Sequence, residues 1–247
     1  MKINPKISIV TVSYNTIAII EETILSIINQ TYTNIEYMII DGGSTDGTIN
    51  IINKYSNKIS YWISENDKGI YDAMNKAINI ASGEWIIFIN AGDKLYSNTI
   101  ISDIFSNSQN YADVYYGDHI IESFHKQIVK IGNNPFYYKS SGYRSMGFSH
   151  QTVFVKTELA RNELFDLSFK CCADYKMIYN LYKNGNTFCY IPKIISIIKG
   201  GEGFSEQHRS LQMLEEAKIC NAEKSLYFRL LFKYRAFKRF IHRIINH

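Results

Sequence analysis

The sequence predicts an α/β protein built on one mostly parallel sheet, flanked by helices and followed by a helical extension. Short apolar runs alternate with segments whose apolar residues recur at helical spacing through the first hundred residues. Each of the first four apolar runs ends in a cluster of small and polar residues. With 46% hydrophobic and 14% aromatic residues, the 247-residue chain can bury a full core and is too apolar to be disordered.

Strands and helices alternate in the first part of the chain. Ile20, Ile24 and Ile27 recur at helical spacing in the first helix, and the third helix is expected to stop near Gly83. Alternation with helices of this length indicates βαβ units and therefore a parallel sheet. Strands are expected at 6–12, 35–40, 59–64 and 84–90, and helices at 17–30, 46–55 and 69–82.

Beyond residue 110 the alternation is less regular, and we expect a longer irregular segment. The expected features are strands at 113–118, 125–131 and 193–199, a helix at 171–185, a long loop at 133–151 and a Gly-rich connector at 200–207. The simplest organisation is one domain over residues 1–205, with halves 1–100 and 101–205, and a C-terminal helical extension over residues 206–247.

Charge and cysteine content narrow the class of protein. The number of basic residues after the last acid, Glu223, is larger than the net charge of +4 of the whole chain. The body that precedes this tail is therefore net acidic, and only the tail is suited to an anionic surface. Adjacent Cys171 and Cys172 do not fit a disulfide framework, and no CxxC pair offers zinc spacing, which predicts reduced thiols in a cytosolic protein. The apolar runs are too short to predict a signal peptide or a transmembrane helix.

Polar clusters follow the first four predicted strands, at 11–15, 41–44, 64–69 and 90–93. In a parallel sheet these ends lie along one edge, where open α/β sheets bind ligands. Turn requirements alone can explain the glycines and some of the Asn and Ser residues. Four consecutive ends that each carry an acid or a hydrogen-bonding pair favour a ligand crevice instead. The absence of a Walker loop and of a GxGxxG after a strand excludes a P-loop enzyme and an ordinary dinucleotide dehydrogenase.

Four motifs in this order, TVSYN, DGGSTDGT, NAGD and ADY, resemble those of glycosyltransferase family 2 over about residues 6 to 200. This family comprises inverting enzymes with the GT-A fold, whose sheet is Rossmann-like. The segments SENDKGIYDAMNKAI and GEWIIFINAGD resemble a bacterial subgroup that builds O-antigen, capsule and exopolysaccharide, including lipopolysaccharide biosynthesis. The resemblance implies a nucleotide-binding half over 1–100 and an acceptor-binding half over 101–205.

The resemblance also implies a nucleotide-sugar site at the sheet edge. Asp41 would accept a hydrogen bond from the uracil ring or ribose, Thr11 would contact the nucleoside, and Tyr14 would lie against the base. Lys68 or Lys76 would lie near the diphosphate, although residues 72–76 could equally form a solvated helix face. The full set implied to bind the nucleotide sugar is Thr11, Ser13, Tyr14, Asn15, Asp41, Gly43, Asp67, Lys68, Asp72, Asn90, Ala91 and Gly92.

Two acids are implied to carry the chemistry. Asp93 falls on the last acid of the family's metal motif and would hold Mn²⁺ or Mg²⁺ on the donor diphosphate, which neutralises charge on the leaving group. Asn90 and Gly92 stand where many relatives carry acids. Asp174 matches the catalytic base that deprotonates the acceptor hydroxyl, although an acid in a first helical turn can serve only the helix dipole. His150 and Gln151 are expected on the acceptor side.

The tail segment 225–246 fits an amphipathic helix with one apolar and one basic side. Such a helix can lie on anionic lipid, or it can dock on the domain with its basic side in solvent. We expect the membrane surface and no nucleic acid, because the body is acidic and no nucleic-acid module is present.

Together these features predict an inverting, metal-dependent glycosyltransferase, peripheral on the inner face of the cytoplasmic membrane. It would move a hexose or N-acetylhexosamine from a nucleotide sugar, first of all a UDP-sugar, to a saccharide on undecaprenyl diphosphate. The alternatives are a catalytically inactive nucleotide-sugar-binding protein and a nucleotidyltransferase, for which no Gly-rich basic loop is found near the N-terminus.

Overall fold

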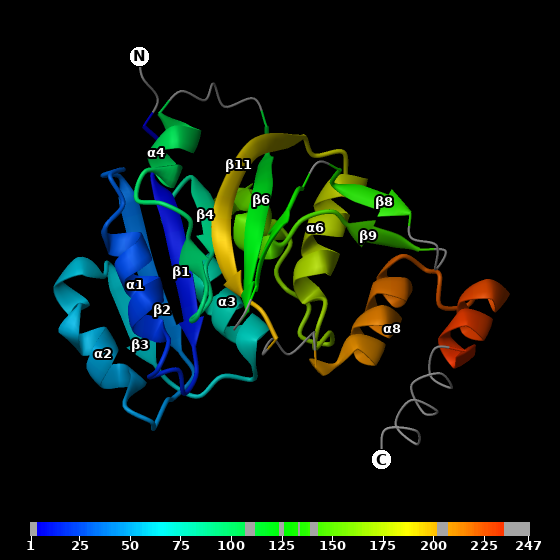
Figure 1. Ribbon diagram of the computed structural model, residues 1–247, viewed down its shortest axis with the longest axis horizontal. Coiled ribbons are helices and arrows are strands. Elements are labelled where there is room, and N and C mark those ends of the chain that lie inside the picture. Colours follow the sequence, from blue (N-terminus) through cyan, green and yellow to red (C-terminus); the bar gives the residue numbers. More distant parts are fainter. Residues whose placement is uncertain are drawn as a thin grey trace.

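The computed structural model describes residues 4–106, 112–123, 126–132, 134–138, 143–201 and 207–234 (Figure 1). Its strands are β1 (Ile7–Ser13), β2 (Ile35–Asp41), β3 (Tyr61–Ser64), β4 (Trp85–Phe88), β5 (Lys94–Leu95), β6 (Val114–Ser123), β7 (Lys126–Lys130), β8 (Phe136–Tyr138), β9 (Arg144–Met146), β10 (Phe154–Lys156) and β11 (Phe188–Lys199). Its helices are α1 (Ile20–Ile28), α2 (Thr48–Lys54), α3 (Ile70–Ile80), α4 (Ile100–Phe105), α5 (Thr157–Asn162), α6 (Ala173–Lys183) and α8 (Arg209–Ile219), with 3₁₀ turns η1 (Ser56–Lys58) and η2 (His150–Thr152) and a further helical stretch at 226–234.

The central sheet has the strand order β3-β2-β1-β4-β10-β6-β11-β5, with β7 paired to β6. The N-terminal strands β3, β2, β1 and β4 run parallel to one another, as predicted. β10 pairs antiparallel with both β4 and β6, and β6 then pairs parallel with β11. The sheet is therefore parallel where the strand–helix repeats occur and mixed beyond β4.

Burial explains why the N-terminal elements form. All seven residues of β1 are buried, as expected for a strand covered on both faces. In α1, Ile20, Ile24 and Ile27 are buried on one face, in agreement with the predicted spacing. The chain ends α3 close to β1, because a Cβ at Gly83 would lie 2.6 Å from the backbone nitrogen of Ser8. Glycine is required there to let the two segments approach.

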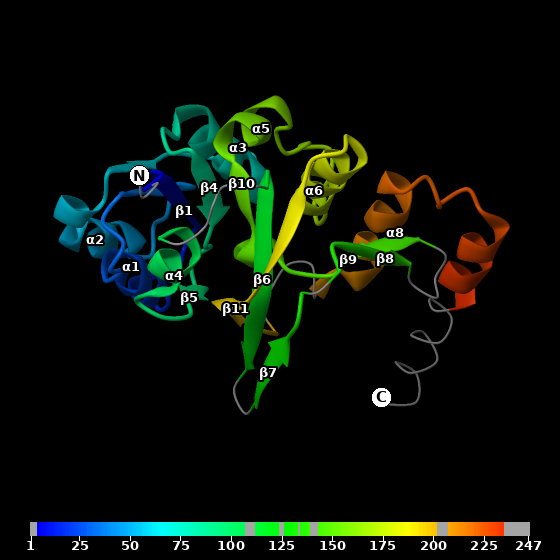
Figure 2. The same ribbon diagram turned by 90° about the horizontal axis from the view of Figure 1, so that it is seen from above.

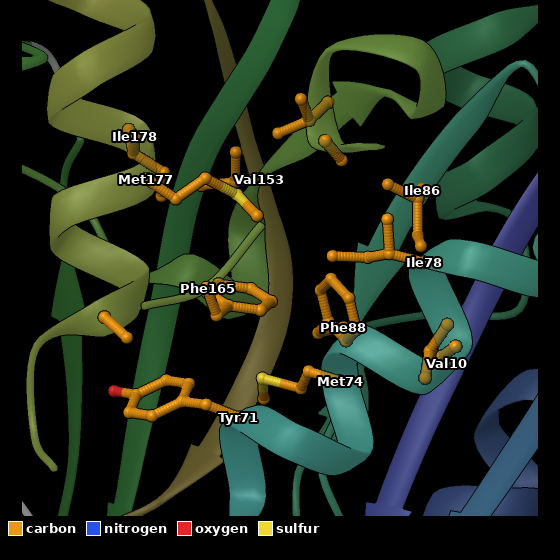
Figure 3. Packing of buried hydrophobic residues seen from close by; sticks show 14 of the residues in the cluster. Val10, Tyr71, Met74, Ile78, Ile86, Phe88, Val153, Phe165, Met177 and Ile178 are labelled. Atoms are coloured by element: carbon orange, nitrogen blue, oxygen red, sulfur yellow. The ribbon is translucent and has the colours of Figure 1, made fainter. Parts of the chain in front are cut away.

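Helices cover both faces of the sheet. On one face, α1, α2 and α4 pack through residues such as Ile24, Ile52 and Phe105. On the other face, α3, α5 and α6 pack against β1, β4 and β6 through a larger apolar cluster. Figure 3 shows part of this cluster, in which Met74 of α3 and Phe88 of β4 lie beside Phe165, with Met177 of α6 nearby. This second layer carries the helices that support the cavity described below.

The second half contains short strands that the sequence did not reveal. The predicted loop at 133–151 includes β8, β9 and the start of η2, and β10 follows it. These strands have three residues each, which is too short to show an alternating pattern. The predicted strands at 113–118 and 193–199 are parts of the longer strands β6 and β11.

The C-terminal helices pack beside α6, at the end of the molecule away from β3 (Figures 1 and 2). α8 contacts α6 and β9, and a small cluster of Tyr143, Met213, Ala217 and Phe228 joins α8 to the helical stretch 226–234. Residues 235–247 of the predicted amphipathic helix lie outside the described part of the chain. Within the described residues, no helix combines the length and apolarity needed to cross a membrane.

Candidate active site

The ends of the first four strands meet at one edge of the sheet, as the sequence predicted. Ser13 of β1 is the register partner of Asp41 in β2, and Asp41 is the register partner of Ser64 in β3. The chain after β4 continues beside β1, because the amide of Ala91 donates to the carbonyl of Val12 at 3.1 Å. Asn90–Asp93 therefore reaches the same edge.

Asp41 organises this edge instead of facing a ligand. Its side chain is fully buried, and its carboxylate accepts hydrogen bonds from the hydroxyls of Ser13, Ser44 and Ser64 and from the amides of Gly43 and Ser44. A carboxylate has about four acceptor sites, and five donors already surround this one. In the structure Asp41 holds the loop, and its contact with the uracil ring or ribose stays a prediction.

Thr11, predicted to contact the nucleoside, also has its hydroxyl engaged within the protein. It is fully buried in β1, where its hydroxyl donates to the carbonyl of Ile89 at 2.9 Å and shares a hydrogen bond with the Tyr37 hydroxyl at 3.1 Å. Ser13 is nearly as buried and its hydroxyl is bonded to Asp41. Neither hydroxyl is presented to a ligand, because β1 is covered on both faces.

Other predicted nucleotide residues remain at the surface of the edge. Tyr14 is 64% exposed and lies against Gly42. Asn15 is exposed, with a φ of 52°, and its side-chain Oδ1 accepts the Thr45 backbone N–H at 2.9 Å. Gly43 has a φ of 82° and no room for a side chain, since a Cβ would lie 2.6 Å from Oδ1 of Asn66. These groups leave a shallow polar surface beside an exposed aromatic ring.

The segment after β3 is an ion-pair cluster. Lys76 pairs with Glu65 at 2.7 Å, with Asp67, and with Asp72 at 3.9 Å. Its ammonium group is therefore matched by protein carboxylates, so Lys76 is not the free cation that a diphosphate would need. Lys68 is exposed, and no ion pair forms at it within the described residues. Asp72 accepts the Lys68 amide at 3.0 Å and holds the start of α3.

A cavity of about 600 Å³ opens beside this edge. Asn90, Ala91 and Asp93 line it from the loop after β4, His150 and Gln151 from η2, and Asp174 from α6. Ten predicted residues do not line it: Thr11, Ser13, Tyr14, Asn15, Asp41, Gly43, Asp67, Lys68, Asp72 and Gly92. The structure thus brings the predicted metal ligand Asp93 and the predicted base Asp174 into one cavity, with other residues predicted to bind the nucleotide along the adjoining edge.

Asp93 is a buried carboxylate in the wall of the cavity. It is 6% exposed, and it accepts the Gln151 amide group and the Lys199 backbone N–H, each at 3.0 Å. Burial raises its pKa to about 6, because these two hydrogen bonds and the charge of His150 only partly offset the loss of water. A cation placed beside the two carboxylate oxygens of Asp93 would stabilise the ionised form of this side chain.

The side chain of Gln151 holds Asp93 in place. Its Nε2 donates to the Asp93 carboxylate, its Oε1 accepts the Ser149 hydroxyl, and the residue is 8% exposed. In the structure Gln151 positions Asp93, and its contact with the acceptor stays a prediction. His150, the preceding residue, faces the other acid.

His150 and Asp174 form a pair inside the cavity. The ring Nδ1 lies 2.7 Å from one carboxylate oxygen of Asp174, and the other oxygen accepts the Tyr71 hydroxyl at 3.0 Å. On its far side, Nε2 of His150 lies 3.3 Å from Nδ2 of Asn90. The 3₁₀ turn η2 therefore connects the two acids, with His150 on Asp174 and Gln151 on Asp93.

Burial and pairing act against each other at both members of this pair. Burial alone would lower the pKa of His150, but the hydrogen bond and charge of Asp174 outweigh it and raise the pKa. Burial alone would raise the pKa of Asp174, but His150, the Tyr175 backbone N–H and Tyr71 outweigh it and lower the pKa. The pair is arranged so that Asp174 stays ionised.

A carboxylate from the C-terminal extension holds the helix that carries Asp174. Glu215 of α8 accepts the backbone N–H groups of Lys170, Cys171 and Cys172 at 2.9 to 3.0 Å. The N-cap residue Cys172 makes no capping hydrogen bond with its own side chain. Glu215 thus satisfies the amides that precede α6 and adds a favourable negative charge near the start of the helix.

His119 also lines the cavity, and the sequence did not single it out. It lies on β6, is 8% exposed, and its Nδ1 is buried without a hydrogen-bond partner among the described residues. Burial and the charge of Lys130 lower its pKa to about 4, so the ring is neutral near pH 7. The predicted strand ended at residue 118, one position before it.

The donor set suits a divalent cation only in part. Asp93 supplies a carboxylate with lone pairs to spare, and two buried atoms of the cavity lack partners among the described residues, His119 Nδ1 and Asn90 Oδ1. No group of three or more His, Cys, Asp or Glu residues gathers within the part of the chain described. A hard cation here would take most of its ligands from diphosphate oxygens and water.

A sheet with parallel N-terminal strands, a polar strand edge and a cavity lined by two acids is the arrangement expected of a GT-A glycosyltransferase, and comparison with known proteins agrees. The family model "Glycosyl transferase family 2" matches residues 8–165, so the chain belongs to that family. Sequence relatives include a PGL/p-HBAD biosynthesis glycosyltransferase of Mycobacterium tuberculosis (strain ATCC 25177 / H37Ra), 33% identical over 48% of each chain. Another is the chondroitin synthase of Escherichia coli, 28% identical over 90% of this chain and 33% of that protein. The chain spans about half the length of the mycobacterial relatives that it matches.

Solved structures confirm the predicted GT-A fold. S. aureus TarS 1–349 in complex with UDP superposes with a TM-score of 0.66 at 19% identity, covering 91% of this chain and 72% of that one. The mannosyltransferase PcManGT from Pyrobaculum calidifontis, in complex with GDP-Man and Mn²⁺, gives a TM-score of 0.68 at 16% identity, covering 95% and 70%. The prediction of a family 2 glycosyltransferase is confirmed.

Proposed function

We propose that this glycosyltransferase moves a hexose or N-acetylhexosamine, with inversion, from a nucleotide sugar to a saccharide on undecaprenyl diphosphate. The observation that carries the proposal is the cavity in which Asp93 and Asp174 meet from two different parts of the chain. One acid is suited to the donor diphosphate and the other to the acceptor hydroxyl, which an inverting displacement requires. The product would be a bacterial surface polysaccharide such as O-antigen or capsule.

The nucleotide sugar would lie across the sheet edge, with its reacting carbon at the cavity. Tyr14 can stack on the base, and Asn15 and Lys68 remain available for ribose and diphosphate. A UDP-sugar is the first choice, and a solved relative by fold is bound to UDP-GlcNAc. Asp93 would hold Mn²⁺ or Mg²⁺, which neutralises charge on the leaving diphosphate when bound. Asn90 and Ala91 would border the donor sugar.

The same proposal places the enzyme on the inner face of the cytoplasmic membrane. The helical stretch 226–234 docks on the protein through Phe228, which is 2% exposed, while Leu226 and Leu230 are 72% and 59% exposed. Arg229 and Lys233 are exposed on the same stretch. Exposed leucines beside basic residues suit an anionic lipid surface, where the lipid-linked acceptor resides.

Thermal unfolding tests the donor site without knowledge of the acceptor. A nucleotide that binds only the folded protein must raise the melting temperature. We expect a shift with one of UDP, GDP, dTDP and CMP that grows when Mn²⁺ is added. The growth with Mn²⁺ should vanish in Asp93→Ala, while the exposed control Asp103→Asn on α4 should behave as wild type. No shift with any nucleotide would contradict the proposal.

Two other activities give different results in the same preparation. An inactive nucleotide-sugar-binding protein would show the shift but no release of nucleotide from the donor, and Asp174→Asn would change nothing. A nucleotidyltransferase would consume a nucleoside triphosphate and release diphosphate. The pairing of Asp174 with His150 and Tyr71 favours the transferase, because a decayed site has no need to keep a buried acid ionised.

A further inference from the structure

His150, next to the predicted base, is the less enclosed member of the pair. Its side chain is 21% exposed and that of Asp174 is 14% exposed. The Asp174 carboxylate has two side-chain donors, one at each oxygen, namely the His150 ring and the Tyr71 hydroxyl. A carboxylate held by these donors is a weak base, because each hydrogen bond favours its ionised form.

The hydrogen bonds of His150 fix which nitrogen can receive a proton. Nδ1 faces an ionised carboxylate at 2.7 Å, so it carries the hydrogen of the neutral ring. Nε2 is then an acceptor, and its neighbour in the structure is the Nδ2 donor of Asn90 at 3.3 Å. That contact lies beyond the usual range for N–H donors and is easily displaced by a hydroxyl. Nε2 is therefore the basic atom of the pair.

Asn90 is suited to both protonation states of His150. Its Oδ1 is buried without a partner among the described residues, while its Nδ2 faces the ring. If Nε2 gains a proton, a half-turn of the amide brings Oδ1 into place as the acceptor. A carboxylate at position 90 would instead hold the ring permanently protonated and remove the acceptor. This gives a physical reason for an amide at the place where many relatives carry an acid.

We infer that His150 is the group that receives the acceptor's proton, with Asp174 as its positioning and charge-balancing partner; this rests on the proposed function. The acceptor oxygen forms its bond to the anomeric carbon as its proton passes to Nε2 of His150. The bond between that carbon and the diphosphate oxygen breaks, and its electron pair leaves with the nucleoside diphosphate. The resulting imidazolium is balanced by Asp174 and returns its proton to solvent after product release.

The charged and titratable groups that surround His150 come from each element packed on η2 or lining the cavity. They are Asp174 and Tyr175 of α6, Tyr71 of α3, Asp93 after β4, His119 of β6, Lys199 of β11 and Glu216 of α8, together with Lys170, Cys171 and Cys172 before α6. Of these, Asp174 is in direct contact and Asp93 adds its charge, so removal of Asp174 has the larger effect on the ring.

The test measures kcat for nucleotide release from UDP-N-acetylglucosamine and GDP-mannose, each with Mn²⁺, as a function of pH. Water is then the acceptor, so no glycan is needed. We expect His150→Gln to lose about a hundredfold or more in kcat with little change in KM, and to lose the acid limb of the profile. Asp174→Asn should keep that limb but move it to lower pH, because the ring loses its negative partner. Imidazole should restore part of the activity of His150→Ala.

The opposite pattern assigns the proton to Asp174. In that case the acid limb persists in His150→Gln with less than about a tenfold loss, it disappears in Asp174→Asn, and imidazole restores nothing. This result would overturn the inference while leaving the transferase proposal intact. Asp103→Asn, remote from the cavity, serves as the matched acid-to-amide control and should retain wild-type kcat.

A second measurement decides the pairing without turnover. ¹⁵N-histidine NMR of the full chain should show a resonance, absent in His150→Gln, with hydrogen on Nδ1 and none on Nε2 at high pH. A ring protonated on Nε2 would overturn the inference. The wild type could turn over neither donor although one nucleotide raises its melting temperature. In that case the transferase proposal fails, and the proton step assigned to His150 fails with it. The NMR tautomer would then test only the pairing of His150 with Asp174.

Discussion

Asp41 and Asp93 are two buried carboxylates whose surroundings shift their pKa values in opposite directions. Burial would raise the pKa of Asp41, but hydrogen bonds from Ser44, Ser64 and Ser13 outweigh it and keep the pKa low. Asp93 has fewer donors, and burial raises its pKa to about 6. The opposite shifts distinguish these two acids, and Asp93 is the one whose charge the protein leaves poorly compensated.

Asp93→Asn should therefore stabilise the ligand-free protein at neutral pH. The pKa of Asp93 is about 6 in the folded protein, above the ordinary value of 3.8. This shift stabilises the folded protein below about pH 4, and the stabilisation is lost as the pH rises through 6. The lost contribution is at most about 3 kcal/mol. An amide has one acceptor atom, so one of the two N–H donors that face the Asp93 carboxylate loses its partner in the variant. This loss offsets about 1 to 2 kcal/mol of the gain in unfolding free energy. We expect unfolding free energy to rise by about 1 kcal/mol at pH 8 and by less at pH 5, as urea unfolding would show.

Added Mn²⁺ and nucleotide should reverse this order of stability. The wild type gains from a cation near Asp93, and the amide variant gains less because it offers no charge. Equal or lower stability of Asp93→Asn at pH 8 without metal would show that the carboxylate is already compensated by Gln151 and Lys199.

Asp41→Asn should destabilise the protein instead. A folded pKa below the ordinary value gives stability that is present at neutral pH and lost as the pH falls into the acid range. The amide nitrogen would face donors such as the Ser44 and Gly43 amides, so we expect a loss of about 3 kcal/mol by thermal or urea unfolding at pH 7. Ser64→Ala removes one donor only and should cost about 1 kcal/mol. A loss in Asp41→Asn no larger than in Ser64→Ala would refute the organising role.

The contrast between these residues shows what a sequence can say about a site. The motif DGGSTDGT placed Asp41 at a strand end, and the register with Ser13 and Ser64 confirms that position. Its partners come from three separate strand ends, and spacing along one chain does not reveal whether a carboxylate meets donors or a ligand. The same limit applies to Thr11, which lies in a strand covered on both faces.

At the scale of elements, the helix that carries Asp174 depends on a residue from a later helix. Glu215 of α8 receives three backbone N–H groups at residues 170–172. Charged hydrogen bonds of this kind are stronger than neutral ones. The division of the chain at residue 205 remains a proposal, and α8 nonetheless contributes Gln212 and Glu216 to the lining of the cavity.

Glu215→Gln should weaken both folding and catalysis. The amide can accept with one atom only, so some of the three N–H groups lose a partner, and we expect a loss of about 2 kcal/mol in unfolding free energy. Because residues 170–172 precede Asp174, nucleotide release from the donor should also slow, with nucleotide binding at the sheet edge unchanged. Glu158→Gln, an exposed change on α5, is the matched control. Slowing in both variants alike would contradict a specific role for Glu215.

Element predictions succeeded where burial imposed a pattern. The strands expected at 6–12 and 35–40 coincide closely with β1 and β2, because continuous apolar runs mark strands covered on both faces. The turn η2 has three residues and no periodic signal, so its position inside the predicted loop was invisible.

At the scale of the whole molecule, one antiparallel strand assembles the cavity. β10 pairs antiparallel with β4, with Val155 opposite Ile86. The residues just before β10 therefore lie beside those just after β4, which brings His150 and Gln151 to Asn90 and Asp93. This pairing joins segments about sixty residues apart in the chain, and nothing local in the sequence specifies it.

The C-terminal stretch gives the last prediction. Phe228 anchors the helix to Tyr143 and to Met213 and Ala217 of α8, and this leaves Leu226 and Leu230 in solvent. A soluble surface gains nothing from such exposure, whereas a lipid surface would bury both side chains. We therefore expect the full chain to co-sediment with vesicles that contain anionic phosphatidylglycerol and much less with neutral phosphatidylcholine vesicles.

Two further measurements distinguish lipid binding by this helix from nonspecific attraction through any basic residue. They are a salt titration and a comparison of charge-removing variants. Each basic residue near an anionic membrane contributes about 1 kcal/mol, so Arg229→Gln with Lys233→Gln should weaken binding about tenfold or more, and rising salt should weaken the wild type in the same direction. The exposed pair Lys126→Gln with Lys130→Gln on β7 removes the same charge elsewhere and should leave vesicle binding unchanged. Equal losses in the two double variants would show that net charge, not this helix, meets the lipid.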